Sequence, residues 1–251
     1  MRQTFAVFKR EMGVYFRSPI AYAISFALLL FFGLLFSNAL SSANQQQQPA
    51  SGVNFVPNLL TFLMFLVAPL LTMRLIAEEN REGTLEVLMT MPIRESQFIL
   101  GKYLAVWAFY TILLLLTVIY HIIVTTVGIP DNGQVLGMYF GAWLYGGATL
   151  AVCMIWSAMF EDQIVAAFFG AGTILLLYLA DIAANWASSL PDANLSATLS
   201  GIINELGLQA HYEATLLQGI VRAEDVLYFV FLIVGALFIT TRIVEVRRWR
   251  S

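Results

Sequence analysis

A polar stretch over residues 74–102 is the only long interval between apolar segments that carries mixed charge. Its charged residues are Arg74, Glu78, Glu79, Arg81, Glu82, Glu86, Arg94, Glu95 and Lys102. Apolar runs long enough to cross a bilayer flank it on both sides, so the stretch cannot form a domain of its own and is expected at a membrane face. A short amphipathic helix along that face is predicted between Gly83 and Pro92, because apolar residues recur there at helical spacing: Leu85, Leu88 and Met89.

The composition is that of an integral membrane protein. Of the 251 residues, 59% are apolar and only 12% are charged, and the mean hydropathy is +0.78, which leaves no room for a separate soluble domain. A net charge of −3 provides no basic field for nucleic acid. We therefore expect a single membrane domain over residues 1–251 that contacts lipid and has no nucleic-acid partner.

Six apolar runs predict an all-α membrane protein with six transmembrane helices. The runs cover about residues 20–36, 58–77, 103–127, 135–160, 164–181 and 226–241. The second run contains Pro69, which predicts a kink because the ring removes a backbone hydrogen bond. Before the sixth run, near-helical spacing of apolar residues predicts short helices that dip into the outer leaflet: Leu195, Leu199, Ile202, Ile203 and Leu206.

Residues 1–17 are predicted to form an elbow helix that lies in the membrane interface, since apolar and basic residues separate onto two helical faces. The apolar face holds Phe5, Phe8, Met12, Tyr15 and Phe16, and the basic face holds Arg2, Lys9, Arg10 and Arg17. The alternative is a secretory signal peptide cleaved near residues 37–39. The long, bulky aromatic core of residues 20–36 disfavours it.

The distribution of the 13 Lys and Arg residues predicts the orientation. Four precede the first apolar run, four lie in or border the central stretch, four follow the last run from Arg242 onward, and one, Arg222, lies elsewhere. The positive-inside bias therefore places both termini and the central stretch in the cytoplasm, in a multi-pass protein of the cell membrane. The acidic turn at Glu161 and Asp162 does not contradict this, because acidic residues contribute little to the bias.

Three glycines at four-residue intervals open the fourth run: Gly133, Gly137 and Gly141. A stripe of this kind lets another helix approach closely. Two roles remain open for it, namely contact with a second subunit and packing within this chain.

No catalytic or metal site is predicted on the chain. His121 and His211 are far apart in the sequence and lack Cys or acidic neighbours at ligand spacing. A phosphate-binding loop of the Walker type is also missing, because Gly101-Lys102 is followed by Tyr103 rather than by Ser or Thr. We therefore expect no cofactor on this polypeptide and no ATP bound by that kind of loop.

Several motifs in order along the chain resemble those of ABC-2 type permeases, the membrane subunits of ABC transporters. The matches are Glu78-Glu79, the string from Glu82 to Glu86, Pro92, Gly101-Lys102, the turn from Glu161 to Ala167, and the segments 208–212 and 219–229. The turn at Glu161 is particularly similar to that of gliding-motility-type permeases. The resemblance covers most of the chain, although its motifs are loose and none is catalytic.

This resemblance implies the membrane half of an ATP-driven exporter. Two six-helix subunits, identical or related, would face each other and dock on separate ATPase chains that bind ATP and Mg. The ATPase contacts would come from the surface helix of the central stretch, here a coupling helix, and from the second turn: Glu78, Glu79, Glu82, Gly83, Thr84, Glu86, Leu88, Pro92, Glu161 and Asp162. The competing interpretation of the central stretch is a solvated loop whose charges only keep it in water.

Two other functions are weighed against this one. An ion-coupled secondary transporter or channel would need ionisable groups deep in its spans, and the best candidate, Asp181, is expected near the outer end of its helix. An intramembrane enzyme would need paired catalytic groups within one span, whereas Lys9 and Lys102 are expected at the interface. The sequence does not predict which substrate is carried.

Overall fold

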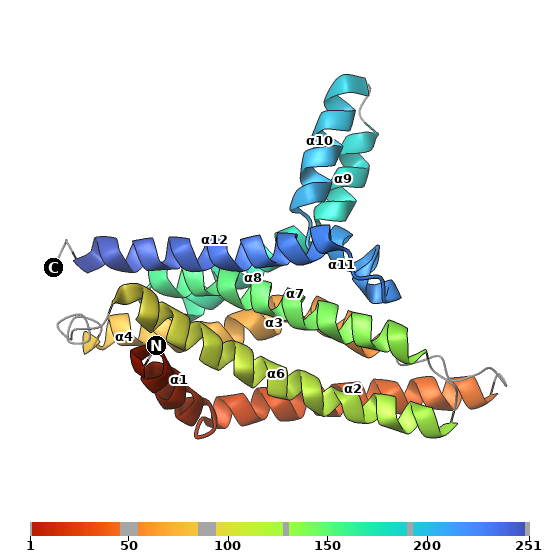
Figure 1. Ribbon diagram of the computed structural model, residues 1–251, viewed down its shortest axis with the longest axis horizontal. Coiled ribbons are helices and arrows are strands. Elements are labelled where there is room, and N and C mark those ends of the chain that lie inside the picture. The colour runs from red at the N-terminus through yellow and green to blue at the C-terminus, as the bar shows by residue number, and fades with distance from the viewer. Residues whose placement is uncertain (1, 46–54, 85–93, 128–130, 190–192, 249–251) are drawn as a thin grey trace.

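The computed structural model describes residues 2–45, 55–84, 94–127, 131–189 and 193–248, and every regular element in these ranges is a helix. The long helices run along a common direction as an elongated bundle (Figure 1). Both chain termini lie toward one end of this bundle, which we call the near end, and the start of α7 (Asn132–Met159) marks the opposite, far end.

Five helices in the described residues are long and apolar enough to cross a membrane, or six if one bent pair is counted as a single span. They are α2 (Pro19–Gln45), α3 (Phe55–Thr72) with its continuation α4 (Arg74–Arg81), α6 (Glu95–Val127), α7 and α12 (Ala223–Arg248). The bent pair is α8 (Gln163–Tyr178) and α9 (Ala180–Ser188). The all-α membrane fold predicted from the sequence is confirmed.

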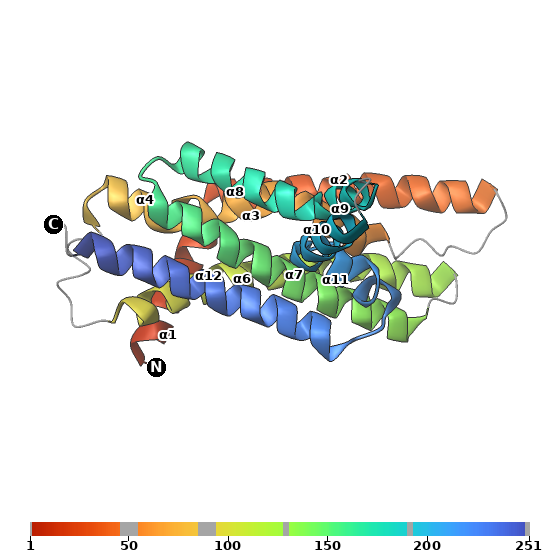
Figure 2. The same cartoon turned by 90° about the horizontal axis from the view of Figure 1, so that it is seen from above.

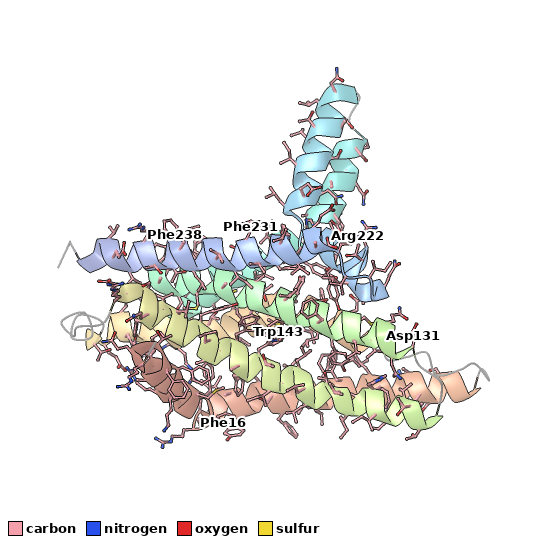
Figure 3. All side chains as sticks on the ribbon, viewed as in Figure 1. Phe16, Asp131, Trp143, Arg222, Phe231 and Phe238 are labelled. Atoms are coloured by element: carbon pink, nitrogen blue, oxygen red, sulfur yellow. The ribbon has the colours of Figure 1, made fainter. Side chains whose placement is uncertain are left out.

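Helix α7 forms the centre of the bundle and packs against α3, α6, α8 and α12. In its most apolar part 78% of the residues are buried, against 17% in α2 and 22% in α12. The outer helices instead present apolar side chains outward, as Phe231 and Phe238 of α12 do in Figure 3. This is the distribution that a bundle surrounded by lipid requires, because there the exterior as well as the core is apolar.

Glycines of α7 allow two aromatic residues of α6 to pack directly on its backbone. A Cβ atom at Gly146 would lie 2.2 Å from Tyr110, and one at Gly147 would lie 2.8 Å from Trp107. The Tyr110 hydroxyl donates a 2.8 Å hydrogen bond to the Ala142 carbonyl. Small residues thus bring the two helices close, and the aromatic polar groups satisfy their hydrogen bonds across the contact.

The glycine stripe at the start of α7 lies partly against the same chain. A Cβ atom at Gly137 would lie 2.5 Å from Gly219 Cα, and one at Gly141 would lie 2.7 Å from Leu216 Cβ. These partners belong to the irregular segment around α11 (Ala210–Glu213) and the short helix η2 (Leu216–Gln218). Gly133 instead lies at the helix start, where a Cβ atom would be 3.3 Å from Asp131 Oδ1. Gly137 and Gly141 therefore serve packing within the chain in this structure.

The fifth apolar run, predicted as a span over about residues 164–181, is bent near its end. Helices α8 and α9 meet at Leu179 with a bend of 44°. At the bend, the Leu208 N–H donates to the Leu177 carbonyl at 3.2 Å, so a distant segment occupies a backbone acceptor at the end of α8. Beyond it, α9 and α10 (Ala193–Leu206) pack side by side as a hairpin that projects from the bundle (Figures 1 and 2). Apolar spacing alone does not reveal such a bend.

Candidate coupling site

The residues predicted to contact ATPase chains fall partly inside the described ranges. Those described lie in α4, directly after it, or at the turn before α8: Glu78, Glu79, Glu82, Gly83, Thr84, Glu161 and Asp162. Glu86, Leu88 and Pro92, and with them the helix predicted between Gly83 and Pro92, lie outside the described residues. The two described groups lie toward the near end of the bundle, and α4 packs against α8 (Figures 1 and 2).

A buried ion cluster joins three helices at this end. Lys102 Nζ of α6 lies 3.0 Å from Glu11 Oε1 of α1 (Arg2–Tyr15) and 3.0 Å from Glu79 Oε1 of α4. The Lys102 side chain is 2% exposed. Arg10 Nη2 reaches the same Glu79 oxygen at 3.2 Å from the half-exposed side of the cluster. Two cations and two carboxylates therefore balance, which allows charges to remain buried.

Two members of this cluster have partners that the sequence does not predict. Lys102 is expected at the membrane interface, and in the structure it lies about two turns inside α6, buried between Glu11 and Glu79. Glu11 is not predicted as a functional residue at all. The available signal is its position, because it falls on the apolar face of residues 1–17, where a carboxylate requires a partner.

Helix α4 is also tied to the central helix α7 through one hydroxyl group. Ser157 Oγ accepts hydrogen bonds from the backbone N–H groups of Ile76 at 3.1 Å and Ala77 at 3.2 Å, and donates to the Met73 carbonyl at 3.0 Å. Ser157 thus satisfies backbone groups at the α3–α4 junction. The helix break lies at Met73, four residues beyond the proline at which the sequence predicts a kink.

The end of the elbow helix is fixed to the same junction. The Tyr15 hydroxyl donates a 2.7 Å hydrogen bond to the Leu71 carbonyl. Arg74 donates to Ser18 Oγ at 2.7 Å, and its guanidinium lies 5.2 Å from the centre of the Tyr15 ring. Burial raises the pKa of Tyr15 far above its usual range, so the hydroxyl remains a neutral donor at physiological pH. These hydrogen bonds connect the end of α1 to the junction between α3 and α4.

A cavity of about 410 Å³ lies beside the ion cluster. Its charged lining residues are Arg10, Glu11, Arg74, Glu78, Glu79, Glu82 and Lys102. Helix α4 ends at this cavity because Gly83 adopts a left-handed conformation with φ of 67°, which a glycine reaches without steric cost. Glu82 is exposed at the rim. The lining of the cavity therefore combines four carboxylates with three cations, and Glu82 is accessible at its edge.

The second predicted contact is a helix cap. Asp162 Oδ1 accepts hydrogen bonds from the backbone N–H groups of Ile164 at 2.7 Å and Val165 at 3.1 Å, and so begins α8. Glu161 precedes it on the exposed side of the turn. Asp162 in the acidic turn is therefore the N-cap of α8.

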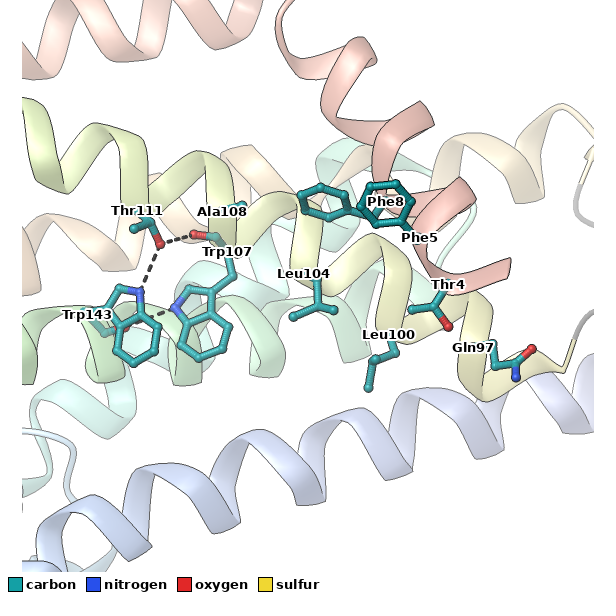
Figure 4. Close-up of a pocket in the computed structure, with 10 residues that line it drawn as sticks. All are labelled: Thr4, Phe5, Phe8, Gln97, Leu100, Leu104, Trp107, Ala108, Thr111 and Trp143. Carbon is teal, nitrogen blue, oxygen red and sulfur yellow. Dashed lines mark hydrogen bonds between the residues drawn. The ribbon is translucent and has the colours of Figure 1, made fainter. Parts of the chain in front are cut away.

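An apolar groove of about 840 Å³ runs beside the site between α1, α6 and α7. Figure 4 shows Phe5 and Phe8 of α1 on one side and Trp107 and Trp143 on the other. The two indole rings stack with centroids 4.3 Å apart, and Trp107 Nε1 donates to the Trp143 carbonyl at 3.2 Å. The elbow helix therefore contacts α6 both at the ion cluster and through apolar side chains such as Val7 against Gly101, and the apolar groove opens beside this contact.

Comparison with known proteins assigns this membrane fold to a family. The model of the family described as ABC-2 family transporter protein matches residues 37–203. This is more than half of the chain, which therefore belongs to the ABC-2 transporter family, as the ordered motifs predicted.

Two similar curated proteins are both described as a probable multidrug ABC transporter permease, YbhS, one from Escherichia coli strain K12 and one from Escherichia coli O157:H7. Each is 25% identical to this chain over 112 residues, which are 45% of this chain and 29% of the relative. The match thus spans less than a third of the length of these relatives.

Proposed function

We propose that the chain is the permease of an ATP-driven exporter, and that separate ATPase subunits carrying ATP and Mg dock on the near end of its bundle. The observation that supports this most is the buried cluster of Lys102, Glu11 and Glu79, which joins three helices directly behind the acidic residues predicted to meet a partner. Family membership and the multidrug permease description of the relatives agree with the proposal.

The contacts define a path for movement into the membrane. A partner that displaces the end of α4 would move Glu79, and through Lys102 it would move α6, because the buried pair cannot separate without exposing unpaired charge to an apolar surrounding. The hydrogen bonds of Ser157 carry the same displacement to α7. Movement at the acidic cavity would therefore reach the centre of the bundle and alternate access to a pathway between subunits.

The remaining parts of the proposal follow from charge and symmetry. The positive-inside bias supports a cytoplasmic location for the near end and both termini. A second permease chain, identical or related, would complete the pathway. Cysteine introduced at Ser42 in a Cys153→Ser background should react with an impermeant thiol reagent in intact cells, whereas cysteine at Glu82 should not; the reverse pattern would refute this orientation.

An ion-coupled transporter receives less support. Asp181 lies in α9, beyond the bend and outside the central contacts of α7. The buried charges of the near end are already paired with one another. Neither set resembles an ion site within the spans.

The test is a charge reversal that leaves the cluster intact. Glu78→Lys combined with Glu82→Lys should leave membrane insertion and folding unchanged but abolish cross-linking to an ATPase chain from a photoreactive residue at Thr84, and with it ATP hydrolysis by the purified complex. The matched control reverses an exposed carboxylate outside this cavity, Glu205→Lys, and should behave as wild type. The wild-type chain purified alone should hydrolyse no ATP. Hydrolysis by the chain alone, or a double variant that cross-links and hydrolyses normally, would contradict the proposal.

A further inference from the structure

The apolar groove between α1, α6 and α7 has no part in the proposed coupling to ATPase chains. Its volume is about 840 Å³, and no Asp, Glu, Lys or Arg is among its described lining residues. Two of these residues are large, apolar and outward-facing, since Phe5 is 65% exposed and Leu100 is 43% exposed. In a membrane protein such a hollow can hold a lipid, another helix or a carried molecule.

The groove follows one face of α6. Its lining residues on this helix recur at helical spacing from Gln97 to Thr111, and Figure 4 shows Leu100, Leu104 and Trp107 in succession between them. At a rise of 1.5 Å per residue, this interval is about 21 Å long. One leaflet contributes half of the hydrocarbon core of a bilayer, or about 15 Å. The groove is therefore long enough for one acyl chain that lies along the helix.

The polarity of the groove changes along its length. At the end farther from the near end, Trp143 Nε1 donates to Thr111 Oγ1 at 3.0 Å, and Thr111 Oγ1 donates to the Trp107 carbonyl at 2.7 Å. The polar groups there are paired within the chain, so the indole rings present an apolar surface. The two lining residues toward the near end, Thr4 and Gln97, are polar (Figure 4). A lipid shows the same change from its head group to the end of its acyl chain.

Two cations of α1 lie beside the edge of the groove. Lys9 follows Phe5 by four residues and Arg2 precedes it by three, so both side chains neighbour Phe5 on the helix surface. Both are exposed, and neither forms an ion pair with another described residue. Glu11, the carboxylate of α1, pairs instead with Lys102. The edge of the groove is therefore positively charged.

We propose that the groove binds one phospholipid with an anionic head group. An acyl chain lies along α6 between the phenylalanine rings of α1 and the two stacked indole rings, and Arg2 and Lys9 bind the head group. The long stems of these two side chains allow their charges to reach around the edge of the groove. Basic residues beside a membrane surface attract anionic lipid, which the cytoplasmic leaflet contains. The lipid would connect the elbow helix with α6 and α7.

Two other occupants fit the groove less well. Helices that associate in lipid approach closely through glycine and other small residues, whereas no glycine is among the described lining residues and the exposed side chains are bulky, as Phe5 and Leu100 are. A second copy of the chain therefore finds no surface for close helix packing here. An apolar cation carried as cargo would meet the positive charges of Arg2 and Lys9 at the edge, which disfavour it.

The experiment measures how brominated phospholipids quench tryptophan fluorescence of the full chain in nanodiscs. Three of the five tryptophans, Trp156, Trp186 and Trp249, are replaced by Phe, so that the signal comes from Trp107 and Trp143 in the groove. Brominated phosphatidylglycerol, which is anionic, should bind at these tryptophans about fivefold or more tightly than brominated phosphatidylcholine, because two cations favour it. Thermal unfolding of this chain and of each variant below confirms that it folds.

Two variants separate the head group from the acyl chain. Arg2→Gln combined with Lys9→Gln should bring the preference for phosphatidylglycerol to about one. The matched control, Arg17→Gln with Arg222→Gln, changes the net charge equally at exposed residues outside the groove lining and should keep the preference. Ala108→Phe fills the groove and should lose most of the quenching by either lipid, whereas Ala183→Phe at an exposed position of α9 should not.

Several results would overturn the proposal. Equal binding of the two lipids would exclude an anionic site, and an equal preference in the Arg2–Lys9 variant and its control would indicate general attraction to a basic chain. Unchanged quenching in Ala108→Phe would place the acyl chain elsewhere. A complete lack of quenching would mean that a second copy covers the groove, and displacement by a cationic apolar dye at lower concentration than by unbrominated phosphatidylglycerol would assign it to cargo. None of these measurements involves an ATPase chain, so their failure is distinguishable from failure of the proposed function.

Discussion

The near-end ion cluster and the base of the hairpin formed by α9 and α10 differ in whether their buried polar groups are joined by ion pairs. At the near end, Lys102 lies 3.0 Å from both Glu11 and Glu79, while the second oxygen of Glu79, Oε2, is buried without a hydrogen-bond partner among the described residues. At the hairpin, Asp181 and Gln209 each bury an acceptor that no donor in the described chain reaches. The ion pairs of the near end therefore hold three helices together, whereas the two acceptors at the hairpin base make no such connection.

The strongest test of this comparison is the removal of the shared cation. Lys102→Met would leave Glu11 and Glu79 buried without their ammonium partner and should lower the free energy of unfolding by about 3 to 5 kcal/mol. Denaturant unfolding in detergent micelles measures it. The control Lys9→Met removes an exposed lysine of α1 and should have little effect. A loss of less than about 1 kcal/mol in Lys102→Met would mean that water already screens the cluster.

The next largest effect should come from the packing that supports the hairpin base. Gly137→Ala places a Cβ atom 2.5 Å from Gly219 Cα, so backbone must shift, and we expect destabilisation of about 1 to 3 kcal/mol. Gly172→Ala in α8 meets no atom within 4 Å and should be neutral or stabilising by up to about 1 kcal/mol. Equal unfolding curves for the two variants would show that Gly137 is not constrained by this chain.

A smaller effect is expected at the acidic turn, where the polar group serves a helix end. Asp162→Ala removes the acceptor of two backbone N–H groups and should cost about 1 kcal/mol of stability. Asp162→Asn keeps a capping oxygen and should cost less than the alanine variant. If both variants lose ATPase docking at unchanged stability, the carboxylate itself contacts the partner.

The smallest change in stability is predicted at Asp181 in α9, at the base of the hairpin. Asp181→Asn breaks no ion pair, and the loss of its favourable position in the first turn of α9 is offset by removal of a partly buried charge. Its free energy of unfolding should therefore stay within about 0.5 kcal/mol of wild type. A loss comparable to that of Lys102→Met would erase the contrast between the two regions.

The sequence predicts the features that depend on composition and spacing. Apolar runs and ordered motifs identify the membrane fold and the family, because lipid imposes the same length and polarity on any spanning helix. The pairing of Lys102 and the bend at Leu179 cannot be predicted in this way. Each depends on a distant partner, Glu11 in one case and the Leu208 N–H in the other. Spacing along the chain contains no information about such contacts.

The sequence predicts only part of the candidate site. The acidic residues after the second apolar run and at the turn before α8 lie toward one end of the bundle, but their contact with an ATPase remains a prediction. The cluster behind them was not predicted, since its members come from three separate parts of the sequence. A carboxylate on an apolar helical face, such as Glu11, was the one local sign of it.

Ser157 is the side chain of α7 that is hydrogen-bonded to the backbone at the start of α4. A single oxygen atom receives two backbone N–H groups of α4 and holds the carbonyl at its start. Ser157 therefore fixes the start of α4 to the most buried long helix of the bundle. If ATPase chains dock on α4 as we propose, the stiffness of this connection would help to determine how far their movement reaches the centre of the bundle.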